Sequence, residues 1–225
     1  MRFLTFEETA ERFRGRSVAI VGSAPSVLEN EPGFVDSHEV VVRVNNFKLG
    51  REPGIRADVH YSFYGNSVRT TLSQMEIAGV SLCMCKCPDA KTLDSPWHER
   101  TGKIEGVDYR YIYRKREGWW PCDTYVPDVA RYLAKYELLG RHIPTTGFAA
   151  ILDVLACEPR SLYLTGFDFF ASGKHNVDEP WKPGDPSDPI GHRPEAELRW
   201  LADNQNRFCF SGDNRLEELL MTVPA

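Results

Sequence analysis

Short apolar runs, each followed by small or polar residues, recur along this chain of 225 residues and predict alternating strands and helices. The first run, at 17–21, is continuously apolar, which is typical of a strand buried on both faces of a sheet. Further strands are predicted at 39–44, 59–63, 80–87, 109–113, 161–165 and 207–210.

Helical periodicity and end signals predict helices between these strands. A short helix is expected after the small residues at 22–26, and longer ones at 5–13, 70–78, 126–139, 147–157 and 194–204, with a last helix near the C-terminus. The alternation predicts one α/β domain over residues 1–225, with a Rossmann-like, mostly parallel sheet and helices on both faces. Such sheets bind ligands at the carboxyl ends of their strands.

The stretch 171–191 is rich in Pro, Gly, Asp and Lys, and it is predicted to be a long loop inside the domain that acts as a lid. Trp181 lies in it, and a large apolar residue in a polar loop often closes over a ligand. Trp120 belongs to an aromatic group that could stack on an acceptor sugar, although packing in the core is an equally good interpretation of that group.

Charge and composition exclude some classes of function. The net charge of -5 and the pI of about 5.7 argue against a nucleic-acid partner. Residues 1–16 contain no long apolar run, so we expect neither a signal peptide nor a transmembrane segment. We therefore expect a cytoplasmic protein. Oligomeric state cannot be predicted from this sequence.

Metal binding is not expected. Cys83, Cys85 and Cys87 alternate along a predicted strand and would share one buried face, and no fourth ligand follows at a spacing typical of zinc sites. The sequence also lacks an Asp-x-Asp tripeptide, the usual metal ligand set of transferases that use diphosphate sugars.

Small residues after the first strand suggest a phosphate site. Gly22, Ser23 and Ala24 would let a ligand approach the backbone, and the following helix would direct free N–H groups at an anion. The full dinucleotide fingerprint is missing, so a plain tight turn is an equally good interpretation of this segment taken alone.

Other polar groups follow other predicted strands or precede helices. They are Asn45 and Asn46, then Thr145, Thr146 and Gly147, and finally Gly166 and Asp168. Amides and hydroxyls at such positions can hydrogen-bond a base, a ribose or a sugar. They can equally cap helices and turns, which is the favoured interpretation of Thr145 alone.

Two histidines flank the predicted lid. His192 could remove a proton from an acceptor hydroxyl, and His175 could bind the departing phosphate. On histidine content alone, two exposed loop residues are the better interpretation. Glu197 lies five residues after His192, and we expect it to cap or anchor its helix.

Taken together, these segments resemble a known family. VAIVGSAPSV and VVRVNNFKLG resemble the large motif of the sialyltransferases, and IPTTGFAAILDVLACEPRSLYLTGFDFF resembles their small motif. His175 resembles the histidine of the third motif, and His192 with Glu197 resembles the very short motif. The four motifs occur in the family's order, and together they cover roughly half of the chain, from the first strand to the last helix.

The resemblance implies an A-type glycosyltransferase fold and an inverting, metal-independent transfer. The donor would be a CMP-activated sugar carrying sialic acid or a related keto sugar, the acceptor a glycan or glycolipid, and no cofactor would be needed. It implies that Ser23 and Asn45 contact the nucleotide or its phosphate, and that Thr146 and Gly147 line the donor pocket. His192 would be the general base and His175 the phosphate ligand.

The sequence departs from the family pattern at several positions. The first strand has no cysteine, so Cys157 cannot form the bridge of the animal members. Asn176 follows His175 where an aromatic residue is usual, and Phe170 is the nearest counterpart of a phosphate-binding tyrosine in bacterial relatives. Three alternatives therefore stay open: a CMP-Kdo transferase, a transferase using another nucleotide sugar, and a non-catalytic CMP-binding module.

Overall fold

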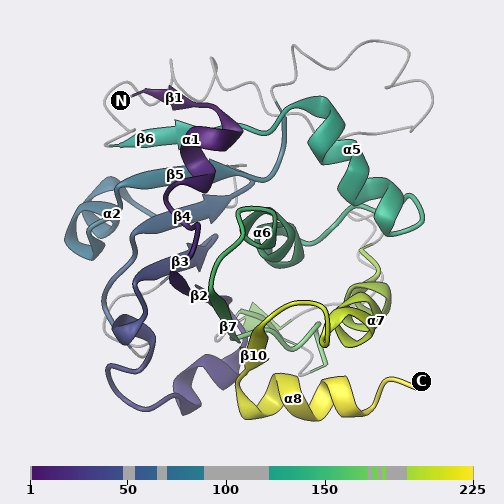
Figure 1. The fold of residues 1–225 in the computed structure, drawn as a ribbon. Coiled ribbons are helices and arrows are strands. Elements are labelled where there is room, and N and C mark those ends of the chain that lie inside the picture. The colour runs from purple at the N-terminus through teal and green to yellow at the C-terminus, as the bar shows by residue number, and fades with distance from the viewer. Residues whose placement is uncertain are drawn as a thin grey trace.

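The computed structural model describes residues 2–47, 54–64, 70–88, 122–171, 174–176, 179–180 and 192–224. Its centre is an eight-stranded sheet in which every pairing is parallel (Figure 1). In spatial order the strands are β1 Phe3–Leu4, β6 Asp123–Tyr125, β5 Leu82–Cys85, β4 Val59–Ser62, β3 Val40–Val44, β2 Ser17–Val21, β7 Ser161–Thr165 and β10 Phe210–Gly212.

Helices cover both faces of this sheet. They are α1 Phe6–Ala10, α2 Leu72–Ala78, α5 Val129–Leu138, α6 Thr146–Leu155, α7 Pro194–Asn204 and α8 Asn214–Met221, with 3₁₀ turns η1 Pro25–Glu29 and η2 Val35–Ser37. One face packs against α1, α6, α7 and α8 in the largest core cluster. The other face packs against α2 and the two 3₁₀ turns. The expected α/β fold, with helices on both faces, is confirmed.

Strand β3 shows why the central strands read as continuous apolar runs. Its residues alternate between the two cores: Val42 and Val44 join the cluster under α6, whereas Val41 joins the cluster under η1 and η2. Arg43 also lies on the second face, almost fully buried, and donates from Nε to the carbonyl of Arg56 at 2.9 Å. Burial on both faces removes the alternation of a half-exposed strand.

The order in which successive strands are added to the sheet reverses between β2 and β7, which are parallel neighbours. From β2 the order runs through β3, β4 and β5 on one side and through β7 and β10 on the other. Ligands of open α/β sheets bind at such a switch point, beyond the carboxyl ends of the strands. The segments 22–24, 45 and 166–168, which follow β2, β3 and β7, all lie at this edge.

Several elements differ in the structure from those predicted from the sequence. The last strand was expected at 207–210 but begins at Phe210, because Arg207 and Phe208 prolong the turn after α7 and donate to the carbonyl of Asn204 at 3.0 and 3.2 Å. The first helix ends at Ala10 rather than at residue 13. Strands β1 and β6 were missed, and the strand expected at 109–113 lies outside the described residues.

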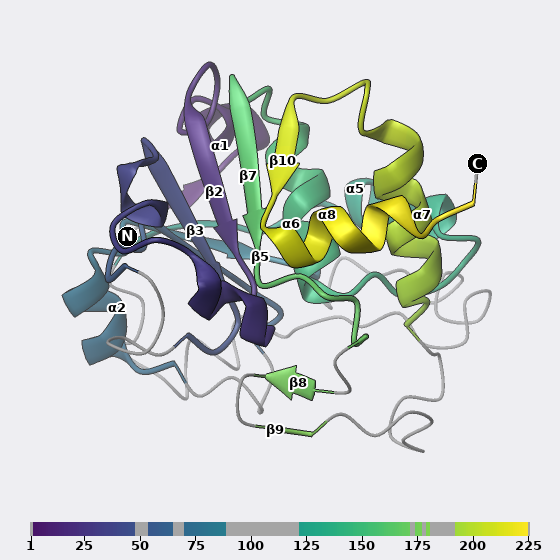
Figure 2. The ribbon, with the colours of Figure 1, turned by 90° about the horizontal axis from the view of Figure 1, so that it is seen from below.

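The stretch expected to be a loop at 171–191 contains two short strands. They are β8 Lys174–Asn176 and β9 Glu179–Pro180, which pair antiparallel in a separate sheet. Figure 2 shows this small sheet on the side of the main sheet where the central strands end. A hairpin gives backbone N–H and C=O groups partners that a loop would leave to water.

The cysteines agree in part with the predicted thiol face. Cys83 and Cys85 lie on the face covered by α2, and their buried sulfurs belong to its core. Cys87 lies beyond the end of β5 and packs with Tyr132 and Leu133 of α5 instead. In the described part of the chain, no helix is long and apolar enough to cross a membrane.

Candidate functional site

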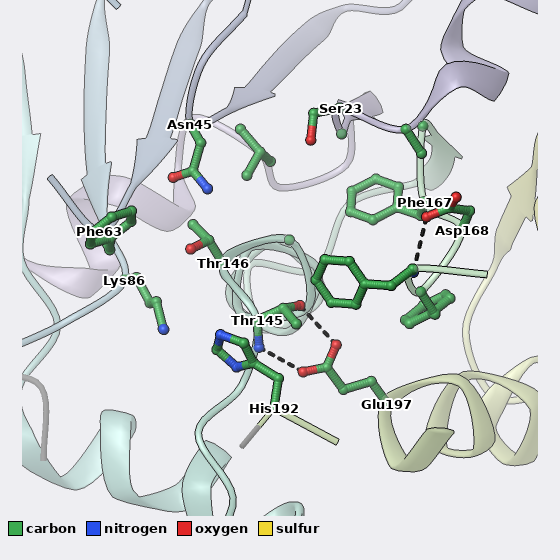
Figure 3. A pocket seen from close by; sticks show the side chains of 17 residues that line it. Ser23, Asn45, Phe63, Lys86, Thr145, Thr146, Phe167, Asp168, His192 and Glu197 are labelled. Carbon is green, nitrogen blue, oxygen red and sulfur yellow. Dashed lines mark hydrogen bonds between the residues drawn. The ribbon is translucent and has the colours of Figure 1, made fainter. Parts of the chain in front are cut away.

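A cavity of about 250 Å³ opens at the carboxyl ends of the strands from β5 to β7 (Figure 3). The start of α6 and the segment leading into α7 form its other wall. The residues that line it are Gly22, Ser23, Ala24, Val44, Asn45, Phe63, Lys86, Thr145, Thr146, Gly147, Gly166, Phe167, Asp168, Phe169, Phe170, His192 and Glu197.

At the switch point, one wall of the cavity consists of two backbone segments in close contact, and this wall is called the glycine wall below. Gly22 donates to the carbonyl of Thr165 at 2.8 Å, and Ala24 donates to the carbonyl of Gly166 at 3.0 Å. A Cβ on Gly22 would lie 2.3 Å from the oxygen of Gly166, and Gly166 itself adopts a positive φ of 73°. Both positions therefore require glycine. At Gly22 a side chain would clash with Gly166, and at Gly166 a side chain would clash with Gly22 and would also strain the backbone at positive φ.

Asn45 is held by four hydrogen bonds in a left-handed conformation with φ of 54°. Its N–H donates to the carbonyl of Tyr61 at 2.9 Å. Its carbonyl accepts from His60 Nε2 at 2.7 Å and from Thr70 Oγ1 at 2.9 Å. Its side-chain Oδ1 accepts from Ser62 Oγ at 3.0 Å, which turns the Nδ2 amide group toward the cavity as a donor (Figure 3).

His60, which holds the backbone of Asn45, is fully buried. Burial lowers its pKa to about 4, so the ring is neutral at pH 7. Because a carbonyl only accepts, the ring hydrogen lies on Nε2, and Nδ1 faces the hydroxyl of Tyr64 at 3.1 Å.

The start of α6 is fixed by a carboxylate from another helix. Thr145 is the N-cap of α6, and its Oγ1 accepts from the N–H of Phe148 at 3.1 Å. Its own N–H donates to Glu197 Oε1 at 2.6 Å, and its hydroxyl donates to Glu197 Oε2 at 2.7 Å. Glu197 therefore anchors α6, whereas the sequence suggested that it anchors its own helix, α7.

Glu197 is completely buried, and that burial raises its pKa to about 7. The hydrogen bonds from Thr145 act in the opposite direction and favour the ionised form, but burial has the larger effect. The carboxyl group thus titrates near neutral pH while it holds the wall of the cavity.

His192 lies in the cavity beside Thr145 and Glu197 (Figure 3). Its Nδ1 donates to the carbonyl of Ile143 at 2.9 Å. In the neutral ring the lone pair is then on Nε2, which is the arrangement that a general base requires.

The cavity brings together most of the residues predicted from the sequence. Nine of the ten predicted donor-binding residues line it with His192, and the tenth, Asn46, does not. The side chains of His175, Trp120 and Trp181 lie outside the described residues. Within the described ranges, no group of three or more His, Cys, Asp or Glu residues could hold a metal ion.

Several lining residues were not predicted from the sequence. Lys86 is the most important: it directly follows β5, and the strand was predicted to run on to residue 87. The signal existed, because a polar residue at the end of an apolar strand is the same pattern that pointed to Asn45. Phe167, Phe169 and Phe170 were also missed as a group, and Phe169 and Phe170 both have positive φ, of 50° and 63°.

No protein-family model and no curated protein match this sequence. Solved structures do match its fold. The sialyltransferase CstII from Campylobacter jejuni, in complex with the substrate analogue CMP-3FNeuAc, superposes with a TM-score of 0.56 at 15% identity, covering 88% of this chain and 81% of that one. The same enzyme with a trisaccharide acceptor and CMP gives a TM-score of 0.52 at 14% identity, covering 88% and 80%.

A mammalian sialyltransferase in complex with Gal-beta-1-3GalNAc-ortho-nitrophenol gives a TM-score of 0.55 at 19% identity, covering 88% of this chain and 69% of that one. At these identities the similarity concerns the fold, and the three matches agree on it. The chain therefore has a sialyltransferase-like fold.

Proposed function

We propose that this protein is a metal-independent, inverting glycosyltransferase that moves sialic acid or a related keto sugar from a CMP-linked donor to a hydroxyl group of a glycan or glycolipid. One observation carries the proposal: the turn at Gly22–Ala24, the start of α6 at Thr145–Gly147 and the imidazole of His192 all line one cavity. The sialyltransferase-like fold and the four sequence motifs support the same activity.

The donor nucleotide fits the arrangement of the lining residues. The start of α6 suits a single phosphate, since helix N-termini favour anions, and the small residues of the turn let the phosphate approach the backbone. The Nδ2 group of Asn45 offers a further donor to the nucleotide. A monophosphate leaving group carries less charge than a diphosphate, so these groups can stabilise it without a divalent cation.

The chemical step would be a direct displacement. The acceptor oxygen attacks the anomeric carbon and its proton passes to Nε2 of His192, while the bond from that carbon to the phosphate oxygen breaks and CMP departs. Attack from the face opposite to the leaving group inverts the configuration. His175 is proposed, from its place in the third motif, to stabilise the departing phosphate.

The test is His192→Ala in a transfer assay with a CMP-linked keto sugar and a galactose-terminated acceptor. Loss of the base should lower kcat by about 10²- to 10⁴-fold, while CMP binding measured by calorimetry stays near the wild-type value. His142→Ala, a histidine outside the lining residues, is the matched control. Near-normal turnover by His192→Ala would exclude His192 as the base.

Donor class and metal use are tested separately. The wild-type protein should be stabilised against heat by CMP but not by UMP or GMP, and its transfer activity should survive excess EDTA. A protein that binds CMP but shows neither transfer nor slow hydrolysis of the donor would instead be a non-catalytic CMP-binding module, the alternative suggested by Phe170 and Asn176.

A further inference from the structure

Two buried sulfur atoms are in contact where β5 and β6 lie side by side. The Sγ atoms of Cys83 and Cys122 are 3.4 Å apart and share a hydrogen bond, although the residues are 39 positions apart in the sequence. Cys83 belongs to β5, and Cys122 directly precedes β6, the neighbouring strand (Figure 1). Both thiols are free, and both side chains pack in the core cluster under α2.

Little movement is needed to join these two sulfurs. A disulfide bond is about 2.05 Å long, so the atoms have only to close part of their present separation of 3.4 Å. Cys83 is held in place, because β5 is paired with β4 on one side and with β6 on the other. The ladder of β6 begins at Asp123, one residue after Cys122, so Cys122 is the residue with freedom to approach.

The hydrogen bond between the sulfurs gives them different chemical roles. Donation by Cys83 lowers the pKa of the Cys122 thiol, and the same bond, together with burial, raises the pKa of the Cys83 thiol. Because a thiolate is the nucleophilic form of cysteine, Cys122 is the sulfur that reacts first. Exposure agrees with this order, since Cys122 is 8% exposed and Cys83 is fully buried.

Cys157 shows what an inert buried thiol looks like in the same protein. Burial raises its pKa to about 12, and its Sγ donates to the carbonyl of Asp153 at 3.1 Å in the opposite core. Its bond is to a backbone oxygen, with which no disulfide can form. The pair at β5 and β6 differs because each sulfur has the other as its hydrogen-bond partner.

We propose that Cys83 and Cys122 are a modification site, at which a hydroperoxide oxidises the folded protein to a reversible disulfide. The Cys122 thiolate attacks one oxygen of hydrogen peroxide, the O–O bond breaks, and the hydroxide that leaves takes up the thiol proton as water. Cys83 sulfur then attacks the sulfenic acid on Cys122, and the S–O bond breaks to release a second water with the proton of Cys83. Each sulfur loses one electron and each peroxide oxygen gains one.

The bond would anchor a weak edge of the main sheet. Strand β6 pairs with β5 over three residues and with β1 over two, so few hydrogen bonds hold it. A covalent link between β5 and the start of β6 closes a long loop, which reduces the conformational freedom of the unfolded chain. We expect oxidation to raise Tm by about 5 to 10 °C.

The first arm of the experiment maps the bond. Folded wild-type protein is treated with a small excess of hydrogen peroxide, its remaining thiols are blocked with N-ethylmaleimide in urea, and it is digested with trypsin without reduction. We expect peptides 70–86 and 117–131 to be joined, and dithiothreitol to separate them. Fragmentation at Met84 distinguishes a link to Cys83 from one to Cys85. Monomers are taken from a non-reducing gel, because the exposed Cys209 can join two chains.

The second arm measures Tm of the reduced and oxidised forms by scanning calorimetry. Cys122→Ala and Cys83→Ala should abolish the rise in Tm on oxidation. Cys85→Ala is the matched control, because Cys85 is a buried cysteine on the same strand and in the same core cluster, and this variant should keep both the linked peptides and the rise. The scan of each reduced variant shows whether it folds.

Three results would overturn the inference. One is a pair of thiols that stays reduced in the wild type although peroxide has oxidised the exposed Cys209, and another is a link from Cys122 to Cys85. A correctly linked protein whose Tm equals that of the reduced form would overturn the anchoring of the sheet edge. The inference is independent of the proposed activity, since neither Cys83 nor Cys122 is among the residues that line the cavity.

Discussion

Two walls of the same cavity are built by different physical means. At the switch point, the glycine wall takes its shape from the close contact between the backbones of Gly22 and Gly166, and no titratable group takes part in that contact. The other wall, called the polar wall below, is held by hydrogen bonds to buried ionisable residues: His60 donates to the carbonyl of Asn45, and Glu197 accepts from Thr145. The first kind of wall should be sensitive to added volume and the second to pH.

Gly166→Ala should have the largest effect. An added Cβ would meet the carbonyl carbon of Gly22 at 2.9 Å, at a positive φ. We expect a loss of about 2–4 kcal/mol in the free energy of unfolding and loss of CMP binding. Gly33→Ala is the control, because its φ is also positive, at 79°, and nothing lies within 4 Å of its added Cβ. Equal losses in urea denaturation would show that contact with Gly22 is unimportant.

His60 should make the protein less stable as the pH falls. Its pKa of about 4 in the folded protein lies below the usual value of 6.5 for histidine, so the unfolded chain binds more protons between these values. Its contribution, about 3 kcal/mol, is present above pH 6.5 and is lost as the pH falls toward 4. The stability of His60→Gln, measured in urea, should depend less on pH in this window than that of the wild type, while His142→Gln should behave as the wild type does.

Glu197 should have the opposite pH dependence. Its pKa of about 7 lies above the usual value of 4.5 for glutamate, so the folded protein binds more protons than the unfolded chain between these values. Stability due to this group is highest below pH 4.5 and decreases by about 3 kcal/mol as the pH rises to 7. Glu197→Gln should remove that decrease, and the exposed Glu195→Gln on the same helix should not. A wild-type stability that does not fall relative to Glu197→Gln between pH 4.5 and 7 would contradict the assignment.

Ser62→Ala should have the smallest effect. It removes the hydrogen bond that orients the amide of Asn45, worth about 1 kcal/mol, so CMP affinity should fall about fivefold. It also removes the bond that Ser62 Oγ accepts from the N–H of Tyr64 at 3.2 Å, which should lower the free energy of unfolding. The exposed Ser81→Ala, which loses one side-chain hydrogen bond away from the cavity, should bind CMP normally. An unchanged CMP affinity would show that Asn45 needs no help from Ser62.

The sequence predicted the glycine wall better than the polar wall. Glycines after an apolar strand have a local signature, and the carboxyl ends of parallel strands meet at one edge whatever lies between them in the chain. The supports of Asn45 have no such signature. His60 acts on a carbonyl fifteen residues away, and the pairing appears only once β3 and β4 lie side by side.

Other failures of prediction have equally physical causes. Strands β1 and β6 have two and three residues, too few to show alternation. Lys86 was overlooked because a lysine next to a strand usually reaches solvent, and its burial depends on the tertiary fold. Thr145 was assigned to capping, which is correct, but its second contact with Glu197 joins positions 52 residues apart.

The pair of links between residues 143–145 and 192–197 has a mechanical consequence. His192 is tied to the carbonyl of Ile143, and Glu197 is tied to Thr145, so two short segments are fastened at both ends. The imidazole and the first turn of α6 then behave as a single rigid piece. Any opening of the cavity would have to occur between this piece and the sheet, and the distance between the imidazole and α6 would stay constant as the cavity opens.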